Sequence, residues 1–349
     1  MSEEKQKITI IYHKEDNDGV CSAAIVKCFL ERYGDRVGVD NPVYGYIGTN
    51  YAELSRMWEE HTMAVPGVTT EMSRLLDNNM VFMVDLSFNE TEAMEYLFNH
   101  LKGDFFWCDH HKSAIDTSKT WDPDEDCNGI RKTSQSALLN TWDFMCYWMK
   151  VSAAPSDYIR MLSDYDSWAW SRMERYEKKE DKEYLFNFNV GVTCKSGLKV
   201  AWFDRWISSY MDYNGGVNFH EALAADCAAY GKIVRDHNME NVTKAIRDHG
   251  DKTWTVNGDR KACVVFTTEH FNSTSFEELK GADIVNGASF KYNSATGNWT
   301  IGLYNVNDDD EFHCGEYLKA KYNGGGHKGA AGCTVSEEQM IQMLKTRQI

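Results

Sequence analysis

The chain has 349 residues, a formal net charge of -16 and ten cysteines scattered along its length. This length suffices for two domains that each bury a core, and no stretch approaches the roughly 20 consecutive apolar residues that a membrane span requires. The acidic balance argues against a protein that holds long duplex nucleic acid through a basic stripe. Single cysteines without a Cys-x-x-Cys pair predict reduced thiols, and hence a soluble cytoplasmic protein.

Predicted strands and helices alternate through the first half of the chain. The strands are expected at 7–12, 81–84 and 105–108, and the helices at 19–32, 90–101 and 134–150. Repeated strand-helix units predict an α/β domain with a mainly parallel sheet and flanking helices, which we place at residues 1–190. Such sheets bind ligands at the carboxyl ends of their strands.

The pattern changes in the second half. Residues 219–249 are predicted to form one long amphipathic helix within a helical linker at 191–254. Beyond Gly250, short β-like runs separated by Gly, Asn and Asp turns predict a smaller α+β domain at 255–349. A mixed-charge run at 171–183 is interpreted as a solvated helix or loop.

Carboxylates and histidines gather where the predicted strands end. Each group alone is ordinary, since an Asp before a helix commonly caps it. Several such groups at one sheet edge are harder to explain by capping, and their imidazole and carboxylate donors are those that manganese-like ions favour. The candidate residues are His13, Asp16, Asp18, Asp85, Asp109, His110, His111 and Asp164.

A glycine-rich segment lies near the end of the chain. Gly324 to Gly332 reads Gly-Gly-Gly-His-Lys-Gly-Ala-Ala-Gly. We expect a loop that leads into a helix and brings backbone N–H groups close to a phosphate. The alternative is a glycine-rich turn with a solvated His327.

In this order, the motifs resemble those of the DHH phosphoesterase family, which includes RecJ-type exonucleases, nanoRNases, cyclic-di-AMP phosphodiesterases and family II inorganic pyrophosphatases. The glycine-rich segment resembles the nucleotide-gripping motif of the DHH-associated C-terminal domain. The resemblance covers roughly residues 7–170 and 255–335. The matching motifs are His13 with Asp16-Asn17-Asp18-Gly19, then Asp85, then Asp109-His110-His111, and finally Asp164.

The resemblance implies two divalent ions, Mn²⁺ by preference and Mg²⁺ or Co²⁺ as alternatives, that share Asp85. His13 and Asp16 would hold the first ion, although His13 stands three residues before Asp16 where many relatives have two or four. Asp18, His110 and Asp164 would hold the second, with Asp166 as a competing ligand. Asp109 would orient the histidines, and His111 would face the substrate phosphate or the leaving group.

The same resemblance implies that the second domain holds the substrate across a cleft between the domains. Related nanoRNases carry an Arg on the strand before the glycine loop, where this chain has Tyr304. Tyr304, Arg131 or Lys132 are the candidates to replace it. The expected substrate contacts are Gly324, Gly325, Gly326, His327, Lys328 and Arg131.

The activity implied is a metal-dependent phosphodiesterase acting on short oligonucleotides or on linear or cyclic dinucleotides. A RecJ-like single-strand exonuclease, a nucleoside bisphosphate phosphatase and a non-catalytic nucleotide-binding module are the alternatives. A pyrophosphatase is disfavoured, because that branch of the family lacks the glycine-rich histidine loop. Family members are often dimers, so a homodimer also stays open.

Overall fold

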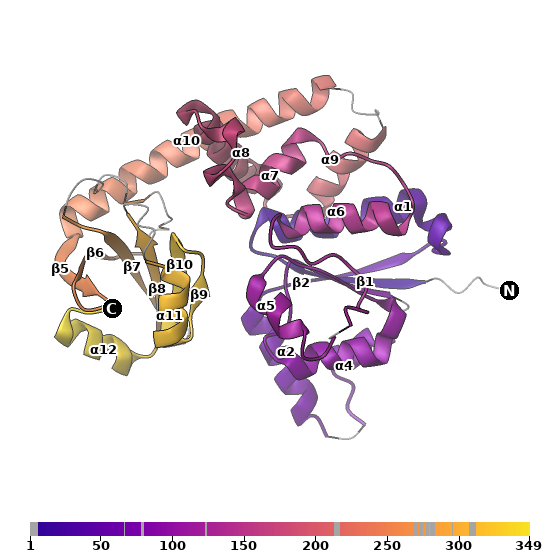
Figure 1. Cartoon of the computed structure of the whole chain (residues 1–349), viewed down its shortest axis with the longest axis horizontal. Helices are drawn as coiled ribbons and strands as arrows, with labels where there is room; N and C mark the ends of the chain where they lie inside the picture. The colour runs from indigo at the N-terminus through magenta and orange to yellow at the C-terminus, as the bar shows by residue number, and fades with distance from the viewer. Residues whose placement is uncertain are drawn as a thin grey trace. The chain divides into compact units, whose positions relative to one another are not determined.

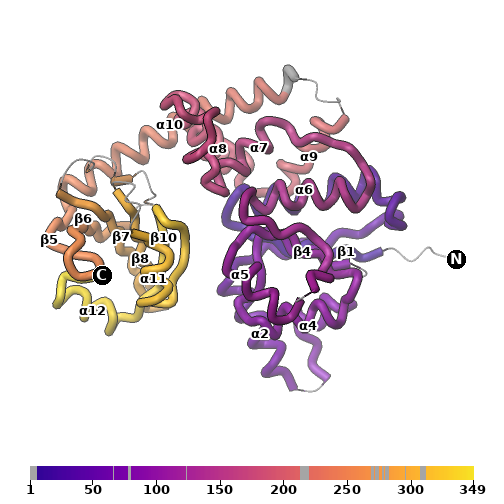
Figure 2. The backbone as a smooth tube through the Cα atoms, viewed as in Figure 1, coloured from indigo at the N-terminus to yellow at the C-terminus, as the bar shows by residue number. Residues whose placement is uncertain are grey.

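The computed structural model describes residues 6–65, 67–77, 80–122, 124–212, 217–268, 271, 275–276, 279, 283–294, 296–306 and 312–349. The chain forms two compact units, Met1–Val234 and Arg235–Ile349 (Figure 1), and Figure 2 traces the backbone through each of them. Within the described ranges, no helix combines the length and the apolar character needed to cross a membrane. The functional boundaries at 190 and 254 stay a prediction.

A four-stranded parallel sheet organises the first unit. Its strands are β1 (Lys7–His13), β2 (Val43–Thr49), β3 (Met80–Val84) and β4 (Phe105–Cys108), in the order β2-β1-β3-β4. The chain leaves β1 for β2 on one side and reaches β3 on the other, so a topological switch point lies between β1 and β3. Open parallel sheets bind ligands at such a point, outside the carboxyl ends of the strands.

Helices cover both faces of this sheet. Alternate residues of a strand point to opposite sides, so the strands contribute apolar side chains to a separate core on each face. Ile10, Phe82 and Phe106 share a core with helices α1, α6, α7 and α9, whereas Val81 and Met83 share another with α2, α3 and α4. Figure 1 shows α1 and α6 on one side of the sheet and α2 and α4 on the other. The helices of this layer structure are α1 (Asn17–Tyr33), α2 (Tyr51–Met63), α3 (Glu71–Leu75), α4 (Thr91–Leu101), α5 (Lys112–Ser118), α6 (Ala137–Trp148), α7 (Asp157–Asp166), α8 (Lys179–Ser196) and α9 (Val200–Asp212), with short 3₁₀ turns η1 (Gly34–Val37), η2 (Lys102–Asp104), η3 (Ala169–Ser171) and η4 (Glu174–Tyr176). The predicted α/β architecture is thus confirmed.

The second unit holds a six-stranded mixed sheet in the order β5-β6-β7-β8-β10-β9. β6 and β7 are parallel, and the other neighbouring pairs are antiparallel. Its elements are β5 (Asp251–Val256), β6 (Arg260–Phe266), β7 (Asn286–Asn293), β8 (Asn298–Asn305), α11 (Cys314–Tyr322), β9 (Gly325–Gly326), β10 (Ala330–Val335) and α12 (Glu337–Thr346). The prediction of a smaller α+β unit here is confirmed. The long helix α10 (Val217–His249) precedes this sheet and contains the division between the units.

The glycine-rich segment corrects one prediction. It does not lead into a helix: Ala330 begins strand β10, which pairs with β9 and β8. Gly326 has φ +139°, and a Cβ atom there would lie 2.6 Å from Ala331 Cα. The glycines therefore serve a tight hairpin between two strands, and the segment does not itself open a helix whose amino terminus could receive a phosphate.

Candidate metal centre

The end of β1 places two of the candidate residues. His13 is the last residue of the strand, and Asp16 caps the amino terminus of α1 by accepting a 2.9 Å hydrogen bond from Gly19 N at its Oδ1. Its other oxygen, Oδ2, lies 2.7 Å from His13 Nδ1. A Cβ atom on Gly19 would lie 2.2 Å from the His13 carbonyl oxygen, so only glycine lets the first turn of α1 pass this close to the strand. Asp16 therefore serves both as a helix cap and as a potential ligand.

Asp18 lies two residues further along the chain and is almost fully buried. Its two carboxylate oxygens accept hydrogen bonds from the backbone N–H groups of Ala137 (2.8 Å) and Leu138 (2.9 Å), at the start of α6. The positive end of the α6 dipole stabilises a carboxylate in this position. The contact also fixes the direction in which the carboxylate faces His110.

Asp85 follows β3 and occupies the centre of the cluster. Its φ of +61° lies in the left-handed region, which is rare outside glycine although Asp tolerates it, and its N–H donates to the carbonyl of Cys108 at 2.9 Å. Asp85 Oδ2 lies 3.7 Å from His13 Nδ1, and Oδ1 lies 3.5 Å from His110 Nε2. One carboxylate therefore faces two histidines from different strand ends, as a bridging ligand would.

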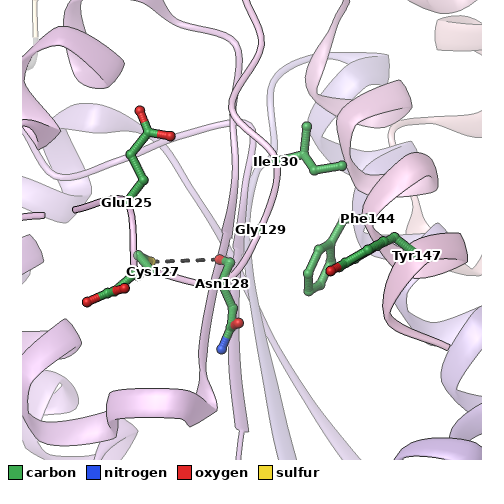
Figure 3. Close-up of a pocket in the computed structure, with 8 residues that line it drawn as sticks. Glu125, Cys127, Asn128, Gly129, Ile130, Phe144 and Tyr147 are labelled. Carbon is green, nitrogen blue, oxygen red and sulfur yellow. Dashed lines mark hydrogen bonds between the residues drawn. The ribbon is translucent and has the colours of Figure 1, made fainter. Parts of the chain in front are cut away.

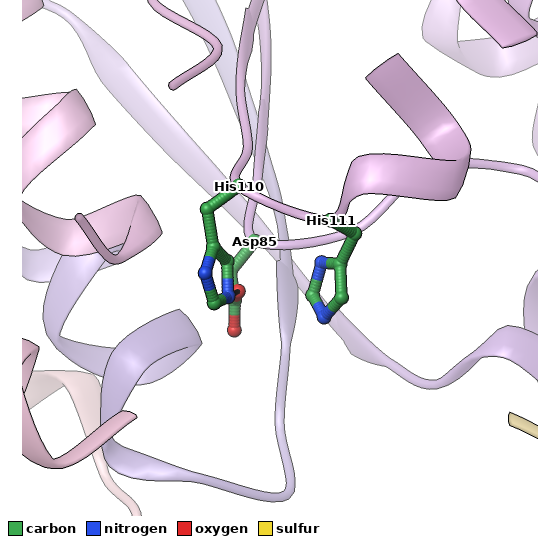
Figure 4. A group of neighbouring side chains, drawn as sticks. All are labelled: Asp85, His110 and His111. Carbon is green, nitrogen blue, oxygen red and sulfur yellow. Dashed lines mark ion pairs between the residues drawn. The ribbon is translucent and has the colours of Figure 1, made fainter. Parts of the chain in front are cut away.

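The Asp109-His110-His111 loop leaves the end of β4 and is organised by Asp109. This carboxylate is fully buried, and its Oδ1 accepts from the backbone N–H groups of both histidines and lies 2.7 Å from His111 Nδ1. Asn140 Nδ2 donates to the Asp109 carbonyl at 2.9 Å and ties the loop to α6. Figure 4 shows both imidazole rings leaving the loop in the same direction, with His110 beside Asp85.

The fourth motif requires a correction, because Asp166 and not Asp164 joins the cluster. Asp166 Oδ2 lies 3.1 Å from His110 Nε2. The buried carboxylate of Asp164 instead accepts a 2.7 Å hydrogen bond from the Tyr176 hydroxyl and forms an ion pair with Arg175. Residues two positions apart on a helix point to nearly opposite sides, so one aspartate faces the histidines while the other holds the segment that follows α7.

Among the residues that the structure describes, three sets of side chains have donor atoms close enough to surround a cation: His13, Asp16 and Asp85; Asp85, His110 and His111; and Asp18, His110 and Asp166. Within each set, the donor atoms lie within 4.8 Å of one another. Asp85 Oδ1 and Asp166 Oδ2 are buried and accept no hydrogen bond from the described residues. Buried carboxylate oxygens are normally paired or coordinate a metal, so these residues fit a divalent cation.

The electrostatics of the cluster agree with that fit. Burial, followed by the negative charges of Asp18 and Asp16, raises the pKa of Asp85 well above its ordinary value. Burial and the Asp18 charge likewise raise the pKa of Asp166 to about 7. Because the carboxylates lie so close together, ionising all of them costs free energy unless positive charge lies among them. A bound cation would supply that charge.

The same negative charges also raise the pKa values of the histidines, which for an imidazole favours the charged, protonated form. Burial alone would lower the pKa of His13, but its hydrogen bonds to Asp16 and Asp85 prevail and raise it to about 10. Burial also opposes protonation of His110, whose pKa is nevertheless raised by Asp166 and Asp18. Without metal, protons on the histidines therefore offset part of the negative charge.

Tyr51 belongs to this site although its sequence context gave no sign of it. It is the first residue of α2, and its ring centroid lies 5.9 Å from that of His13 and 6.0 Å from that of His111. It thus contacts one histidine from each of two candidate sets. Burial and nearby carboxylates, Asp109 first among them, raise the pKa of its phenol, so it stays a neutral hydroxyl.

Arg131 and Tyr304, predicted from sequence as phosphate contacts, have structural roles instead. The Arg131 guanidinium donates to the carbonyls of Trp107 (3.3 Å) and Cys127 (3.0 Å) and lies 3.7 Å from Asp122. Tyr304 is buried, and its hydroxyl donates to the Phe271 carbonyl at 2.8 Å. Both polar groups are therefore engaged within the protein, and neither is available to a substrate.

Backbone hydrogen bonds place the glycine hairpin against α11 in the second unit. His327 N donates to the Ala330 carbonyl at 2.8 Å, and the His327 and Lys328 carbonyls accept from Gly315 and Cys314 at 3.1 Å each. A Cβ atom on Gly315 would lie 2.1 Å from the Gly326 carbonyl oxygen. The hairpin backbone is thus well fixed, which suits a binding element, while its role in binding stays a proposal.

A pocket of about 380 Å³ lies beside α6 in the first unit (Figure 3). Ile130, Phe144 and Tyr147 line it together with the segment from Glu125 to Gly129. Among the described residues that line this pocket there is no candidate metal ligand. It is therefore distinct from the acidic cluster.

Comparison with known proteins identifies the first unit. Residues 7–156 match the model of the DHH family, N-terminal domain. The first unit therefore contains a DHH-family N-terminal domain, and this match covers less than half of the chain. The chain is 22% identical to the oligoribonuclease NrnB of Bacillus subtilis over 267 residues, which cover 74% of this chain and 60% of that relative. The chain thus spans less than two thirds of the length of the curated relative that it matches.

Two solved structures show a more distant likeness. The pGpG-specific phosphodiesterase PggH from Vibrio cholerae aligns with a TM-score of 0.48 and 12% identity, over 98% of this chain and 97% of its own. An exopolyphosphatase-related protein from Bacteroides fragilis gives 0.43 and 12%, over 98% and 91%.

Proposed function

We propose that this protein is a metal-dependent phosphodiesterase that hydrolyses short oligonucleotides or linear or cyclic dinucleotides. The observation that carries the proposal is Asp85, whose two carboxylate oxygens face His13 and His110 from the switch point of the sheet. The match of residues 7–156 to the DHH family N-terminal domain and the similarity to an oligoribonuclease support the reaction and the substrate class.

In the proposed site, His13, Asp16 and Asp85 hold one divalent ion, and Asp18, Asp85, His110 and Asp166 hold the other, with Mn²⁺ preferred over Mg²⁺ or Co²⁺. When bound, two such ions activate a water molecule and neutralise the phosphate oxygens that gain charge. The chain fixes the donors before substrate arrives: α6 orients Asp18, and Asp109 orients both histidines.

His111 is the proposed proton donor to the leaving oxygen. Its Nδ1 lies 2.7 Å from Asp109 Oδ1, which leaves Nε2 as the ring atom free to carry a proton toward substrate. Burial lowers its pKa, but the charge of Asp109 prevails and raises it above the ordinary value. A protonated imidazole with this support suits a general acid.

The glycine hairpin is the proposed substrate-binding element of the second unit. Backbone groups of Gly324, Gly325 and Gly326, with the side chains of His327 and Lys328, would contact a nucleotide. Because the Tyr304 hydroxyl and the Arg131 guanidinium are engaged within the protein, Lys132 is the remaining one of the three candidates for the terminal phosphate.

A substrate panel with and without Mn²⁺ tests the proposal. It contains linear and cyclic dinucleotides, a short RNA, a longer single strand, a nucleoside 3′,5′-bisphosphate and pyrophosphate. We expect turnover of the dinucleotides or short RNA with Mn²⁺, and its loss in Asp85→Asn with unchanged circular dichroism. Preference for the longer strand or the bisphosphate would favour those alternatives, and dinucleotide binding without turnover at saturating Mn²⁺ would favour a non-catalytic module.

A further inference from the structure

The segment that joins α7 to α8 carries features that the proposed reaction has not used. It begins directly after Asp166, passes through the short turns η3 and η4, and reaches α8 at Lys179. Its sequence alone predicts little more than a solvated mixed-charge run. Consecutive Cα atoms are about 3.8 Å apart, so Trp168 has its Cα within about 7.6 Å of that of Asp166.

Four partly exposed aromatic rings form a connected cluster around this segment. The Trp168 and Trp170 ring centroids lie 5.4 Å apart with a 31° interplanar angle. Phe186, on α8, meets Trp170 edge-on at 5.0 Å and Tyr165 edge-on at 5.7 Å. None of the four belongs to the buried cores of the first unit. The rings are therefore held in place by one another while part of their surface stays in contact with solvent.

The cluster is anchored to the metal centre by its own backbone. Trp168 has φ +55° and ψ +20°, a left-handed conformation that turns the chain sharply at the end of α7. Downstream, the buried Asp164 carboxylate holds the segment through Arg175 and the Tyr176 hydroxyl. Helix α7 thus presents Asp166 to His110, and Asp164 on the same helix holds the segment that carries the tryptophans.

One cation lies against the aromatic rings. Lys182 Nζ lies 5.9 Å from the Trp170 ring centroid, whereas the partly exposed Arg175 is paired with the Asp164 carboxylate. Aromatic faces next to a cation are a combination by which proteins hold single-stranded nucleotides without reading their sequence, since every base has a π-face.

We infer that Trp168 and Trp170, with Phe186 behind them, form a nucleobase-stacking subsite for the nucleotide next to the phosphate that is cleaved. The inference rests on the proposed function and adds to it the element of the first unit that selects nucleotides over simpler phosphodiesters. The subsite recognises a planar base of any identity.

Steady-state kinetics with Mn²⁺ test the subsite on three substrates: a linear dinucleotide, and two abasic analogues in which one or the other base is replaced by hydrogen. For Trp168→Ala and Trp170→Ala we expect the KM of the dinucleotide to rise roughly 5- to 100-fold, as removal of a base stack predicts, with kcat nearly unchanged. The KM of the abasic analogue that lacks the stacked base should change less than twofold.

Trp202→Ala is the matched control. Trp202 is also partly exposed, but it lies at the start of α9, whose neighbour Asp204 contacts Lys27. Lys27 is ten residues along α1 from Asn17, about 15 Å from the site at 1.5 Å per residue. This variant should leave the kinetics of all three substrates unchanged. Equal losses on the dinucleotide and on both abasic analogues, or no loss on the dinucleotide, would overturn the inference.

Failure of the proposed function gives a different result. If the wild-type protein hydrolyses no member of the panel, the reaction is wrong, and titration calorimetry of the same dinucleotide then decides the subsite. The tryptophan variants must weaken its binding while Trp202→Ala does not. Equal binding by the wild type and the three variants, or no binding by the wild type, would reject the subsite independently of the reaction.

Discussion

Nε2 of His110 lies 3.1 Å from Oδ2 of Asp166, the last residue of α7. This contact connects the loop after β4 to a helix that begins almost fifty residues later, and so closes the donor set around Asp85. Asp164, only two residues away, is committed to Tyr176 and Arg175. The two aspartates therefore offer a matched pair of tests.

Asp166→Asn should weaken Mn²⁺ binding at one site by at least tenfold and lower kcat/KM by about a hundredfold, because one anionic donor is removed from a shared set. Asp164→Asn should keep the full metal stoichiometry. It should instead destabilise the protein by about 1.5–3 kcal/mol, the cost typical of losing hydrogen bonds to a charged group. The two variants are distinguished by two measurements: their metal content, by plasma emission spectrometry, and their thermal unfolding. Loss of metal in Asp164→Asn alone would reinstate Asp164 as the ligand.

The difference between these residues shows where sequence reasoning stops. The apolar runs that become β1, β3 and β4 lie at their predicted places, since buried parallel strands read as continuous hydrophobic stretches. The groups at their ends converge because parallel strands present their carboxyl ends at one edge. Choosing Asp166 over Asp164 needs the rotational phase of α7, and that helix was not predicted.

Tertiary context decided the other differences. Arg131 looked like a free cation in the sequence, but its guanidinium contacts the Asp122 carboxylate and the Cys127 carbonyl. Ala330 and Ala331 favour helix as small residues, yet pairing with β8 makes them a strand, since strand formation depends on neighbours more than on intrinsic preference. Tyr51 follows β2, a strand that was not predicted, so its place between His13 and His111 could not be foreseen.

Gly19→Ala should disrupt the metal centre by displacing the backbone that positions its ligands. The added methyl group would meet the His13 carbonyl oxygen at 2.2 Å and must push β1 and α1 apart. Overpacking of this kind typically costs about 1–3 kcal/mol, and it should also lower Mn²⁺ affinity by moving His13 and Asp16. Gly103→Ala is the control, because a Cβ atom on Gly103 would meet nothing within 4 Å. Equal stability of the two variants in urea would show that the close approach is not maintained in solution.

Metal binding should release protons, and affinity should rise with pH. In the metal-free protein the pKa of Asp166 is raised to about 7, and that of Asp85 is raised as well, mainly by burial. Below pH 7 a cation must therefore displace a proton, whereas above it the carboxylate is already ionised. Apparent Mn²⁺ affinity should grow by up to about tenfold per pH unit between pH 6 and 7 for each proton released.

Titration calorimetry in two buffers of different ionisation enthalpy measures this release directly. The number of protons released should be larger at pH 6 than at pH 8. The same pKa shifts also make the stability of the fold depend on pH. A carboxylate whose pKa is higher in the folded than in the unfolded state stabilises the fold less as the pH rises from the unfolded to the folded pKa. In chelator, the contribution of this group to the melting temperature should thus fall from pH 5 to pH 7, and added Mn²⁺ should restore it. An affinity independent of pH would contradict the protonated state of the empty cluster.

Asp109→Asn should move the pH dependence of the reaction. Asp109 Oδ1 lies 2.7 Å from His111 Nδ1, and its charge is the main influence that raises the His111 pKa against burial. An amide keeps the shape but removes the charge, so the His111 pKa should fall. If His111 protonates the leaving oxygen, the alkaline limb of the kcat/KM profile shifts to lower pH, and the maximal rate falls about 10²- to 10⁴-fold, the contribution typical of general acid catalysis. A dinucleotide analogue with a nitrophenol leaving group needs little protonation, so Asp109→Asn should slow its hydrolysis far less. Equal losses on both substrates would instead assign Asp109 to metal binding alone.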